Sequence, residues 1–368
     1  MAELYIGLMS GTSLDGVDAV LVDLAAPKVQ VLEHCSLAFS EPLKAELLAL
    51  NTPGDNELHR AALAGNALAR SYAAAVHALL QSCGKAQDQI QAIGVHGQTV
   101  RHRPQEFDGT GYTLQLNQPA LLAELSGIDV VSDFRSRDVA AGGQGAPLVP
   151  PFHQAFFSHT GHSPAILNIG GISNLSVLHS DALLGFDCGP GNALLDFWCS
   201  LHTGCAFDDA GRWAASGAVN SALLETLQDT PYFEKLPPKS TGRDLFNAPW
   251  LRHKLALLPS IPAADVQTTL TELTAWCCAE SVHRFAPQST PLIVCGGGAL
   301  NLELLRRIQA RLPNCRVQTS LQHGLPPLQV EAVAFAWLAQ QTLHRKPGNH
   351  PSVTGARGAR VLGAIYPA

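Results

Sequence analysis

The start of the chain alternates between apolar runs and one polar turn, a pattern typical of a β-hairpin. An apolar run at Leu4–Met9 predicts a strand, and a second run at Ala19–Leu24 predicts the strand that returns beside it. The residues between them, Ser10–Asp18, are rich in Gly, Ser and Asp and therefore predict a long polar tip.

The same pattern returns in the middle of the chain. Ala165–Ile169 and Ile172–Leu178 predict two further strands, and Gly170 and Gly171 predict the turn between them. A pattern repeated at this distance indicates two related halves, each of which opens with a hairpin of its own.

Apolar residues spaced three and four apart predict the helices. The longest, Asn56–Ser82, has Asn56 or Asp55 as its cap and Gly84 as its stop. Shorter elements are predicted as strands at Ile90–Val95, Tyr112–Leu116 and Pro291–Cys295, and as helices at Ala120–Leu125, Leu300–Ala310 and Val330–Thr342. By contrast, Asp133–Pro151 is too rich in Gly and Pro for a regular element, and we expect the chain to cross between two domains near it.

Length and charge restrict the class of protein. A chain of 368 residues predicts two domains. The net charge of −6, without a Lys/Arg-rich run, argues against nucleic acid and anionic membranes as partners. No basic leader and no run of about 18 apolar residues is present, so we expect no signal peptide and no membrane anchor. Nine cysteines without a CxxC pair predict reduced thiols in the cytoplasm.

The two glycine turns are the first candidates for chemistry. Gly11–Asp18 offers glycines, at which a backbone can approach phosphate closely, and the hydroxyls of Thr12 and Ser13. Taken alone, this segment fits an ordinary hairpin turn better. A second turn at Asn168–Asn174 makes phosphate binding the more favoured interpretation, because two such turns, one from each half, can hold a triphosphate.

A third glycine cluster, Cys295–Asn301, follows a predicted buried strand and precedes a helix. Three consecutive glycines there suit close approach to a base or ribose, or else a tight strand-to-helix turn. Neither GxGxxG nor GxxxxGK[ST] occurs at these turns, so a nucleotide would be bound by another kind of fold.

Polar residues at the ends of predicted strands are the remaining candidates. Asp187, in FDCGPGN, suits a general base facing a cleft, or alternatively the cap of the helix that follows. His96–Thr99 reads HGQT and fits a ligand site or a structural histidine equally well. Lys239–Arg243 reads KSTGR and fits an anion contact or, more often, a solvated loop, whereas Glu331 fits an acid that complements a helix dipole.

Read together, the turns resemble the phosphate and adenosine motifs of the actin/hexokinase/heat-shock-chaperone ATPase superfamily. The resemblance narrows to the anhydro-N-acetylmuramic acid kinase family along nearly the whole chain, through motifs that occur in order: MSGTSLDGVD, HGQT, DFR…RD…GGQGAPLVP, LNIGGISNLS, FDCGPGN, PKSTGR, VCGGGALN, EAVAFAWLA and PSVTGA. GGQGAPLVP and FDCGPGN are long and unusual, which makes the resemblance specific.

The resemblance implies an α/β fold of two actin-like (ribonuclease H-like) domains with a nucleotide and sugar cleft between them. We expect residues 1–135 with 343–368 to form the first domain, which carries the first phosphate loop. Residues 136–342 are then expected to form the second domain, with the second phosphate loop, the catalytic aspartate and the adenosine loop. The resemblance also implies a homodimer.

The implied reaction consumes 1,6-anhydro-N-acetylmuramic acid, water and ATP and yields N-acetylmuramate 6-phosphate and ADP. It belongs to peptidoglycan recycling and amino sugar catabolism in the bacterial cytoplasm, with ATP bound together with Mg²⁺. Opening an anhydro bridge resembles glycoside hydrolysis, which commonly uses two carboxyl groups. Here the γ-phosphoryl group can capture the leaving 6-oxygen, so that a single base suffices.

The resemblance also implies roles for residues of this chain. The catalytic base falls on Asp187, and sugar contacts fall on Thr99, Arg135 and Glu331. ATP binding is implied for the first turn, the second turn and the adenosine loop: Gly11, Thr12, Ser13, Leu14, Asp15, Gly16, Val17, Asp18, Asn168, Gly170, Gly171, Gly296, Gly297 and Gly298. Asp15 and Asp18 are expected to hold the metal through water.

Three rival interpretations remain open from the sequence. One is an ordinary hexose or acetylhexosamine kinase with the same fold. Another is an actin-like ATPase that acts as a polymer or chaperone module, against which the absence of an additional peptide-binding domain argues. The third is a two-domain α/β protein whose turns are only structural.

Overall fold

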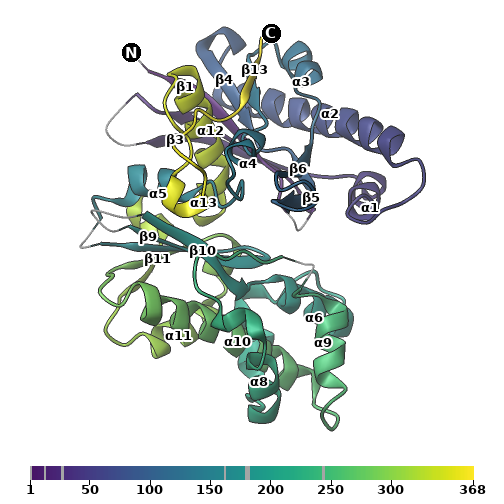
Figure 1. The fold of residues 1–368 in the computed structure, drawn as a ribbon, viewed down its shortest axis with the longest axis vertical. Coiled ribbons are helices and arrows are strands. Elements are labelled where there is room, and N and C mark those ends of the chain that lie inside the picture. The colour runs from purple at the N-terminus through teal and green to yellow at the C-terminus, as the bar shows by residue number, and fades with distance from the viewer. Residues whose placement is uncertain (1, 12–13, 26–28, 161–162, 179–182, 243–244) are drawn as a thin grey trace. The chain divides into compact units, whose positions relative to one another are not determined.

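The computed structural model describes residues 2–11, 14–25, 29–160, 163–178, 183–242 and 245–368. The chain forms two compact units, Met1–Phe152 with Gln329–Ala368 and His153–Leu328 (Figure 1). Each unit is built on a mixed β-sheet with helices packed against it. The chain passes from the first unit to the second within helix α5, Pro150–Phe157.

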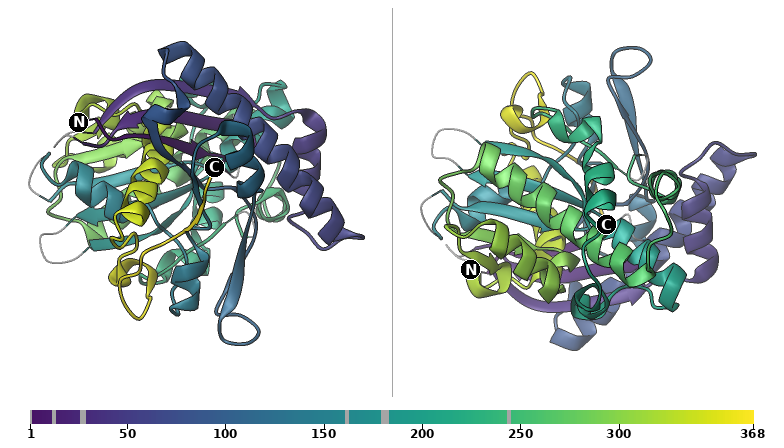
Figure 2. Two further views of the ribbon diagram at one scale, coloured as in Figure 1. Left: turned by 90° about the horizontal axis from the view of Figure 1, so that it is seen from above. Right: turned by 90° about the horizontal axis from the view of Figure 1, so that it is seen from below.

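The first unit contains a six-stranded sheet in the order β13-β7-β4-β1-β2-β3. β1 pairs antiparallel with β2, as the hairpin pattern predicted, and parallel with β4. The strands are β1 Leu4–Met9, β2 Gly16–Asp23, β3 Gln30–Ala38, β4 Ile90–Val95, β7 Val130–Ser132 and β13 Ala364–Tyr366. A separate hairpin, β5 Gln98–Pro104 with β6 Gly111–Leu116, extends beyond the rest of this unit (Figure 2).

Along β1 and β2, successive side chains lie on opposite faces of the sheet. One of these sets packs in a core with helix α2, Glu57–Cys83. Tyr72 and Leu79 of α2 are fully buried in that core, as expected for the apolar face of an amphipathic helix. The remaining helices of the first unit, apart from α12, are α1 Glu41–Ala49, η1 Gln87–Gln89, α3 Pro119–Ser126, α4 Ser136–Ala140 and α13 Pro351–Thr354.

Helix α12, Val330–Leu343, packs directly on β1 and β4 through two glycines. A Cβ atom on Gly7 would lie 1.8 Å from the carbonyl oxygen of Ala332, and one on Gly94 would lie 2.0 Å from that of Phe335. The helix backbone thus contacts the strand backbone with no side chain between them. This packing places α12 in the first unit, so the predicted domain boundary at residue 343 is wrong.

The other predicted boundary, at residue 135, is wrong for a related reason. Asp138 is fully buried, and its carboxylate accepts hydrogen bonds from the Gly145 amide (2.8 Å), Asn349 Nδ2 (2.6 Å) and Thr354 Oγ1 (2.7 Å). These bonds hold the segment after Arg135 to the C-terminal segment of the first unit. The stretch predicted to be irregular also contains a regular element, helix α4.

The second unit contains a five-stranded sheet in the order β10-β9-β8-β11-β12. It opens with the predicted antiparallel hairpin, β8 with β9, and β11 pairs parallel with β8. Both units therefore begin with a hairpin and add a parallel strand beside the first strand, which confirms the repeated pattern. The strands are β8 Ala165–Ile169, β9 Ile172–Leu178, β10 Leu183–Pro190, β11 Leu292–Cys295 and β12 Val317–Thr319.

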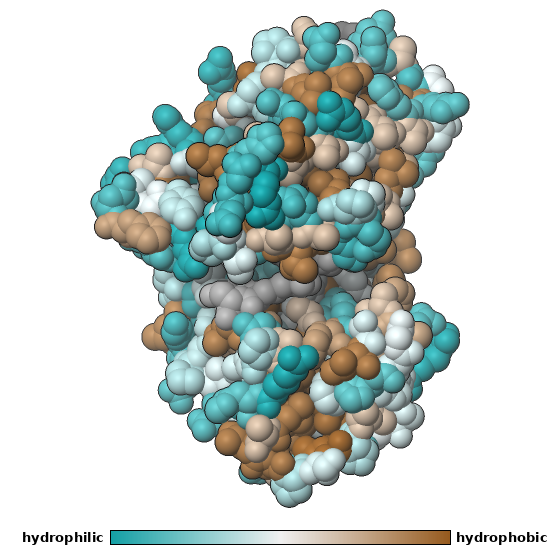
Figure 3. Space-filling view, turned by 90° about the vertical axis from the view of Figure 1, so that its right-hand side faces the viewer, coloured by the Kyte–Doolittle hydropathy of each residue, from teal (hydrophilic) through white to brown (hydrophobic). Residues whose placement is uncertain are grey.

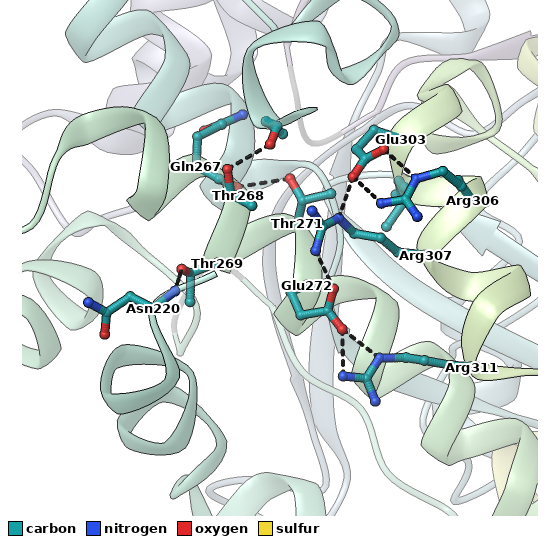
Figure 4. Close-up of polar contacts among 12 residues, drawn as sticks. Asn220, Gln267, Thr268, Thr269, Thr271, Glu272, Glu303, Arg306, Arg307 and Arg311 are labelled. Carbon is teal, nitrogen blue, oxygen red and sulfur yellow. Dashed lines mark hydrogen bonds and ion pairs between the residues drawn. The ribbon is translucent and has the colours of Figure 1, made fainter. Parts of the chain in front are cut away.

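Helix α10, Ala263–Phe285, is the central helix of the second unit and packs on β9, β10 and α11, Leu302–Arg311. An ion-pair network ties α10 to α11 (Figure 4). Arg307, only 12% exposed, donates to Glu272 at 2.5 Å and to Glu303 at 2.7 Å, and Arg311 also pairs with Glu272. The other helices are α6 Ala193–Thr203, η2 Asp209–Gly211, α7 Arg212–Ser216, α8 Ser221–Gln228, η3 Pro231–Glu234, α9 Ala248–Leu255, η4 Gly297–Leu300, η5 Ser320–His323 and η6 Pro327–Gln329.

Polar and apolar side chains are interspersed on the face drawn in Figure 3. Exposed apolar residues include Leu58 on α2, Leu302 on α11 and Phe107 in the turn between β5 and β6. Within the part of the chain that the structure describes, none of the helices combines the length and apolar character needed to cross a membrane.

Candidate functional site

The first glycine turn begins directly after β1. Gly11 accepts a hydrogen bond from the Leu14 amide at 3.2 Å, and Leu14 adopts a positive φ of 62°. Gly16 opens β2, where a Cβ atom would lie only 2.1 Å from the carbonyl oxygen of Leu37. Thr12 and Ser13, which the sequence assigned to ATP binding, lie outside the described residues.

The HGQT segment anchors this turn. Gln98 is 1% exposed, and its Nε2 donates to the carbonyl oxygen of Gly11 at 3.1 Å. Ser10 Oγ donates to the carbonyl oxygen of Gly97 at 3.2 Å and hydrogen-bonds the Tyr72 hydroxyl at 2.8 Å. In the sequence, Gln98 stood out only as part of HGQT and Ser10 only as the start of the polar tip. The HGQT motif drew attention to the segment that contains Gln98. Its hydrogen-bond partner Gly11 could not be predicted, because it lies far away along the chain.

Arg135 and Glu331, predicted to bind the sugar, belong to one charged cluster. Arg135 donates through Nε (3.1 Å) and Nη2 (2.9 Å) to Nε2 of His96, and through Nη1 to the carbonyl oxygen of Gly145 (2.7 Å). Burial and the positive charge of Arg135 hold the pKa of His96 well below its ordinary value, so the ring stays neutral and accepts. Burial raises the pKa of Glu331, while Arg135 lowers it and Asp18 raises it further.

Thr99, the third predicted sugar residue, lies beside this cluster on β5. Its hydroxyl accepts a hydrogen bond from Gln115 Nε2 at 3.2 Å, and Gln115 also donates to Thr113. Thr113 in turn bonds His102 Nδ1 at 2.9 Å. Burial and the charge of Arg135 lower the pKa of His102 to about 4, so this ring is also neutral near pH 7. The hairpin β5–β6 therefore presents neutral polar groups near a guanidinium.

The two predicted metal residues have different neighbours. Asp15 is 79% exposed and lies 4.0 Å from Lys44 of α1. Asp18 lies on β2, and its Oδ1 accepts from Ser36 of β3 at 2.5 Å. Asp15 and Asp18 therefore do not form a pair. Among the described residues, no group of three or more His, Cys, Asp or Glu side chains could hold a metal ion.

The second glycine turn joins β8 to β9. The amides of Gly191, Asn192 and Ala193 donate to the carbonyl oxygens of Gly170 and Gly171 at 2.8–3.1 Å. Within the described residues, the amides of Gly170 and Gly171 donate to no acceptor. Amide groups left without an acceptor on a glycine turn suit an anion such as phosphate.

The third glycine cluster packs against that turn. A Cβ atom on Gly296 would lie 2.5 Å from Asn168 Oδ1, and one on Gly298 would lie 2.4 Å from the Ile169 side chain. Both glycines are thus required by close packing in the protein. Gly297 differs, because its nearest neighbour would be Asn192 Nδ2 at 3.3 Å. The structure brings Asn168, the second turn and the Gly296–Gly298 cluster into one group.

Asp187 lies near the end of β10, where the strand contains a bulge. Asp187 pairs with Asn174 and Gly189 pairs with Ser173, so Cys188 is the extra residue. Bulges of this kind are common beside active sites, where they redirect a side chain. The alternative in which Asp187 caps the following helix is wrong, because α6 begins at Ala193 and its cap position is Asn192.

Backbone and side-chain bonds from another segment hold Asp187. The Thr241 amide donates to its Oδ2 at 2.9 Å, and the Tyr232 hydroxyl donates to its carbonyl oxygen at 2.7 Å. The Asp187 amide donates to the carbonyl oxygen of Lys239 at 3.1 Å. The predicted KSTGR motif therefore contacts the candidate base; its Arg243 lies outside the described residues.

Each unit thus carries a distinct set of chemical groups. The first has a glycine turn, a guanidinium and two carboxylates near it, Asp18 and Glu331. The second has a glycine turn with available amides and a carboxylate held by main-chain and phenol donors. Such groups suit phosphate binding and proton removal from a nucleophile.

Comparison with solved structures supports the fold. The activator of the 2-hydroxyisocaproyl-CoA dehydratase from Clostridium difficile, with bound ADPNP, has a TM-score of 0.50 and 12% identity, and covers 91% of this chain and 93% of that chain. The (R)-2-hydroxyglutaryl-CoA dehydratase component A of Acidaminococcus fermentans has a TM-score of 0.50 and 11% identity, and covers 91% and 96%. The predicted two-domain actin-like α/β fold is confirmed.

Sequence relatives identify the family. A protein of Variovorax paradoxus (strain S110) named anhydro-N-acetylmuramic acid kinase is 64% identical over 372 residues, covering 100% of this chain and 99% of the relative. A protein of the same name from Albidiferax ferrireducens is 59% identical over 389 residues, covering 100% of both. The family model for anhydro-N-acetylmuramic acid kinase matches residues 3–368. The chain therefore belongs to the anhydro-N-acetylmuramic acid kinase family and is an enzyme of that type.

Proposed function

We propose that the chain uses ATP with Mg²⁺ to open 1,6-anhydro-N-acetylmuramic acid with water and to phosphorylate its 6-oxygen. The product is N-acetylmuramate 6-phosphate, formed in peptidoglycan recycling. The observation that carries the proposal is the arrangement around Asp187. Its strand continues directly into Gly191–Ala193, whose amides bond the second glycine turn, so one piece of backbone carries the carboxylate and supports the phosphate-binding group.

The reaction balances with a single base. Asp187 takes a proton from water as the water oxygen attacks the anomeric carbon, and the bond from that carbon to the 6-oxygen breaks. The 6-oxygen then forms a bond to the γ-phosphorus of ATP, and ADP leaves. The γ-phosphoryl group thus replaces the acid that would otherwise protonate the leaving oxygen.

The other predicted residues take supporting roles. In the first unit, Arg135, Glu331 and Thr99 bind the sugar, and the neutral groups of the β5–β6 hairpin lie beside them. The first turn, the second turn and the third glycine cluster bind ATP through Gly11, Thr12, Ser13, Leu14, Asp15, Gly16, Val17, Asp18, Asn168, Gly170, Gly171, Gly296, Gly297 and Gly298. Because Gly296 and Gly298 are already required by packing, Gly297 is the member of its cluster that has room for the nucleotide.

Asp18 is the residue that fits Mg²⁺. Magnesium in ATP enzymes keeps several waters and takes few protein carboxylates, which agrees with one aspartate rather than a cluster. The ion would offset charge on the triphosphate. Asp15 does not fit this role, because its carboxylate faces Lys44 and solvent.

Replacing Asp18 with asparagine should therefore raise the Mg²⁺ concentration that gives half-maximal turnover by about 10-fold, the order expected for loss of one outer ligand. Asp15→Asn should leave that concentration within about 2-fold. Titration of Mg²⁺ at saturating ATP measures both. An equal response of the two variants would contradict the assignment of the metal to Asp18 alone.

Gln98 offers a second prediction, because it holds the first glycine turn by one buried hydrogen bond. Gln98→Leu keeps the volume and removes the donor, so the KM for ATP should rise by about 2- to 10-fold, the size of one hydrogen bond. Steady-state kinetics at varied ATP measure it, with the exposed Gln81→Leu on α2 as the control. An unchanged KM in Gln98→Leu would show that the turn needs no support from HGQT.

The function itself is tested by ADP release that depends on the anhydro sugar. Purified protein with Mg·ATP should release ADP on addition of 1,6-anhydro-N-acetylmuramic acid and not with N-acetylglucosamine. Activity with N-acetylglucosamine alone would favour an ordinary acetylhexosamine kinase. Nucleotide-dependent assembly without sugar turnover would favour the actin-like ATPase.

We also propose a homodimer that acts in the cytoplasm, as the family resemblance implies. The acidic net charge and the lack of a membrane-crossing helix among the described residues are compatible with that location. Light scattering coupled to size-exclusion chromatography tests the dimer, and cell fractionation tests the location.

A further inference from the structure

We propose that residues 239–241 form a positioning strap for the base, in which the main-chain N–H of Thr241 orients the carboxylate of Asp187 and stabilises its ionised form. This inference rests on the proposed role of Asp187. It adds residues that act through Asp187 and do not touch the substrate.

The first argument is that the strap runs along an edge strand. β10 is the outer strand of its sheet, so within the described part of the chain its outer side has no neighbouring strand. The strap supplies the missing partners there: the carbonyl oxygen of Lys239 accepts from the Asp187 amide at 3.1 Å, and the Thr241 amide donates to Asp187 Oδ2 at 2.9 Å. One residue is therefore held by its main chain and by its carboxylate at once.

The second argument concerns what holds the strap. The Lys239 ammonium lies 4.9 Å from the centre of the Tyr232 ring and 5.7 Å from that of Phe186. A cation over aromatic faces is attracted by their electron density, so these contacts fix the strap against the core. Tyr232 also donates to the carbonyl oxygen of Asp187 at 2.7 Å. The ammonium and the phenol thus restrain the same short stretch of backbone.

The third argument is chemical. A hydrogen bond from an amide to a carboxylate favours the ionised form, because the charged oxygen is the better acceptor. A base must be ionised and must keep one orientation while it removes a proton. The bulge at Cys188 makes the end of β10 irregular, so regular strand pairing alone does not fix the orientation of Asp187. The bonds from residues 239–241 supply that restraint.

The acid limb of the kcat–pH profile is not expected to come from Tyr232, Cys188 or Lys239, which lie near Asp187. Burial raises the pKa of Tyr232 and, together with Cys278, that of Cys188. Both groups therefore stay protonated at and below neutral pH. Burial lowers the pKa of Lys239, whose loss of a proton would appear on the alkaline side.

The sharpest test deletes one N–H group. Replacing Thr241 with its α-hydroxy analogue turns that amide into an ester and leaves the side chain in place. We expect kcat to fall by about 10-fold, the KM for ATP to stay within about 2-fold, and the acid limb of the kcat–pH profile to move up by about one pH unit. The same ester at Leu236, an exposed residue whose amide has no acceptor among the described residues, is the matched control.

Side-chain variants provide an independent measurement. Lys239→Met keeps the length of the side chain and removes the charge, so it should lower kcat and move the acid limb in the same direction, and Lys239→Arg should restore part of both. Thr241→Ala keeps the N–H and should keep the acid limb at its original pH.

The outcomes distinguish the proposed role of residues 239–241 from the proposed role of Asp187 as the base. If Asp187→Asn loses turnover while the Thr241 ester and Lys239→Met keep the original kcat and acid limb, the strap is overturned and the base stands. If Asp187→Asn keeps normal turnover, the base itself is wrong and the strap with it. A fall in kcat without movement of the acid limb in both variants would also overturn the strap, because it would show a general loss of structure.

Discussion

Replacing Asp187 with asparagine should lower turnover by about 10²- to 10⁴-fold, the usual contribution of a general base. Asparagine keeps the size of the side chain and can still accept from the Thr241 amide, so the loss comes from proton removal and not from packing. The second glycine turn is bonded by Gly191–Ala193 and not by Asp187, so ATP should bind as before. Steady-state turnover and calorimetric ATP binding measure the two effects.

The exposed Asp229, in the same unit, provides the control: Asp229→Asn should keep normal turnover. A second experiment uses ¹⁸O-labelled water with the unaltered enzyme. Label should appear on the anomeric hydroxyl and not in phosphate, because the water attacks carbon. Label in phosphate would indicate simple ATP hydrolysis and would contradict the proposed mechanism.

The substitution Gly94→Ala should destabilise the protein by about 3 kcal/mol or more. Overpacking a close contact costs about 1–3 kcal/mol in cores that can adjust, and here the added Cβ would meet backbone. That atom would lie 2.0 Å from the carbonyl oxygen of Phe335 and 3.0 Å from Cβ of Ala339, so α12 as a whole must move. Because α12 also carries Glu331, turnover should fall as well. Urea unfolding followed by circular dichroism measures the stability.

Gly54→Ala is the matched control for this prediction. The new Cβ atom there would have one neighbour within 4 Å, the flexible end of Arg60 at 3.3 Å, and the stability should change by less than about 0.5 kcal/mol. If Gly94→Ala were as stable as Gly54→Ala, direct contact between helix and strand backbones would not be essential to this unit.

Much of the fold was predictable because its signals are local. The two hairpins, β1–β2 and β8–β9, combine apolar runs with glycine turns, and the structure has both where they were expected. The predicted helix at Asn56–Ser82 agrees with α2 within one residue at each end. The domain boundaries were wrong because they depend on distant contacts: α12 packs on Gly7 and Gly94, and Asp138 bonds Asn349 and Thr354.

The candidate site shows the same division between local and distant signals. Asp187 and the glycine turns were predictable from short motifs. The support around them was not, because it joins residues far apart in sequence: Gln98 bonds Gly11, and Tyr232 and Thr241 bond Asp187. The difference between Asp15 and Asp18 was also hidden from the sequence, because it depends on their neighbours: Asp15 lies 4.0 Å from Lys44, whereas Asp18 accepts from Ser36.

Because the first unit is discontinuous in sequence, the direction of synthesis affects the order in which the two units fold. The second unit is one continuous segment, His153–Leu328, whereas the first requires α12 on β1 and β4 and β13 beside β7. During translation the second unit is therefore complete while the first still lacks helices α12 and α13 and its edge strand β13. Domains generally fold as units, so the second unit is expected to reach its native state first. The first unit can complete its fold only after residues 329–368 leave the ribosome, and until then part of its sheet is uncovered.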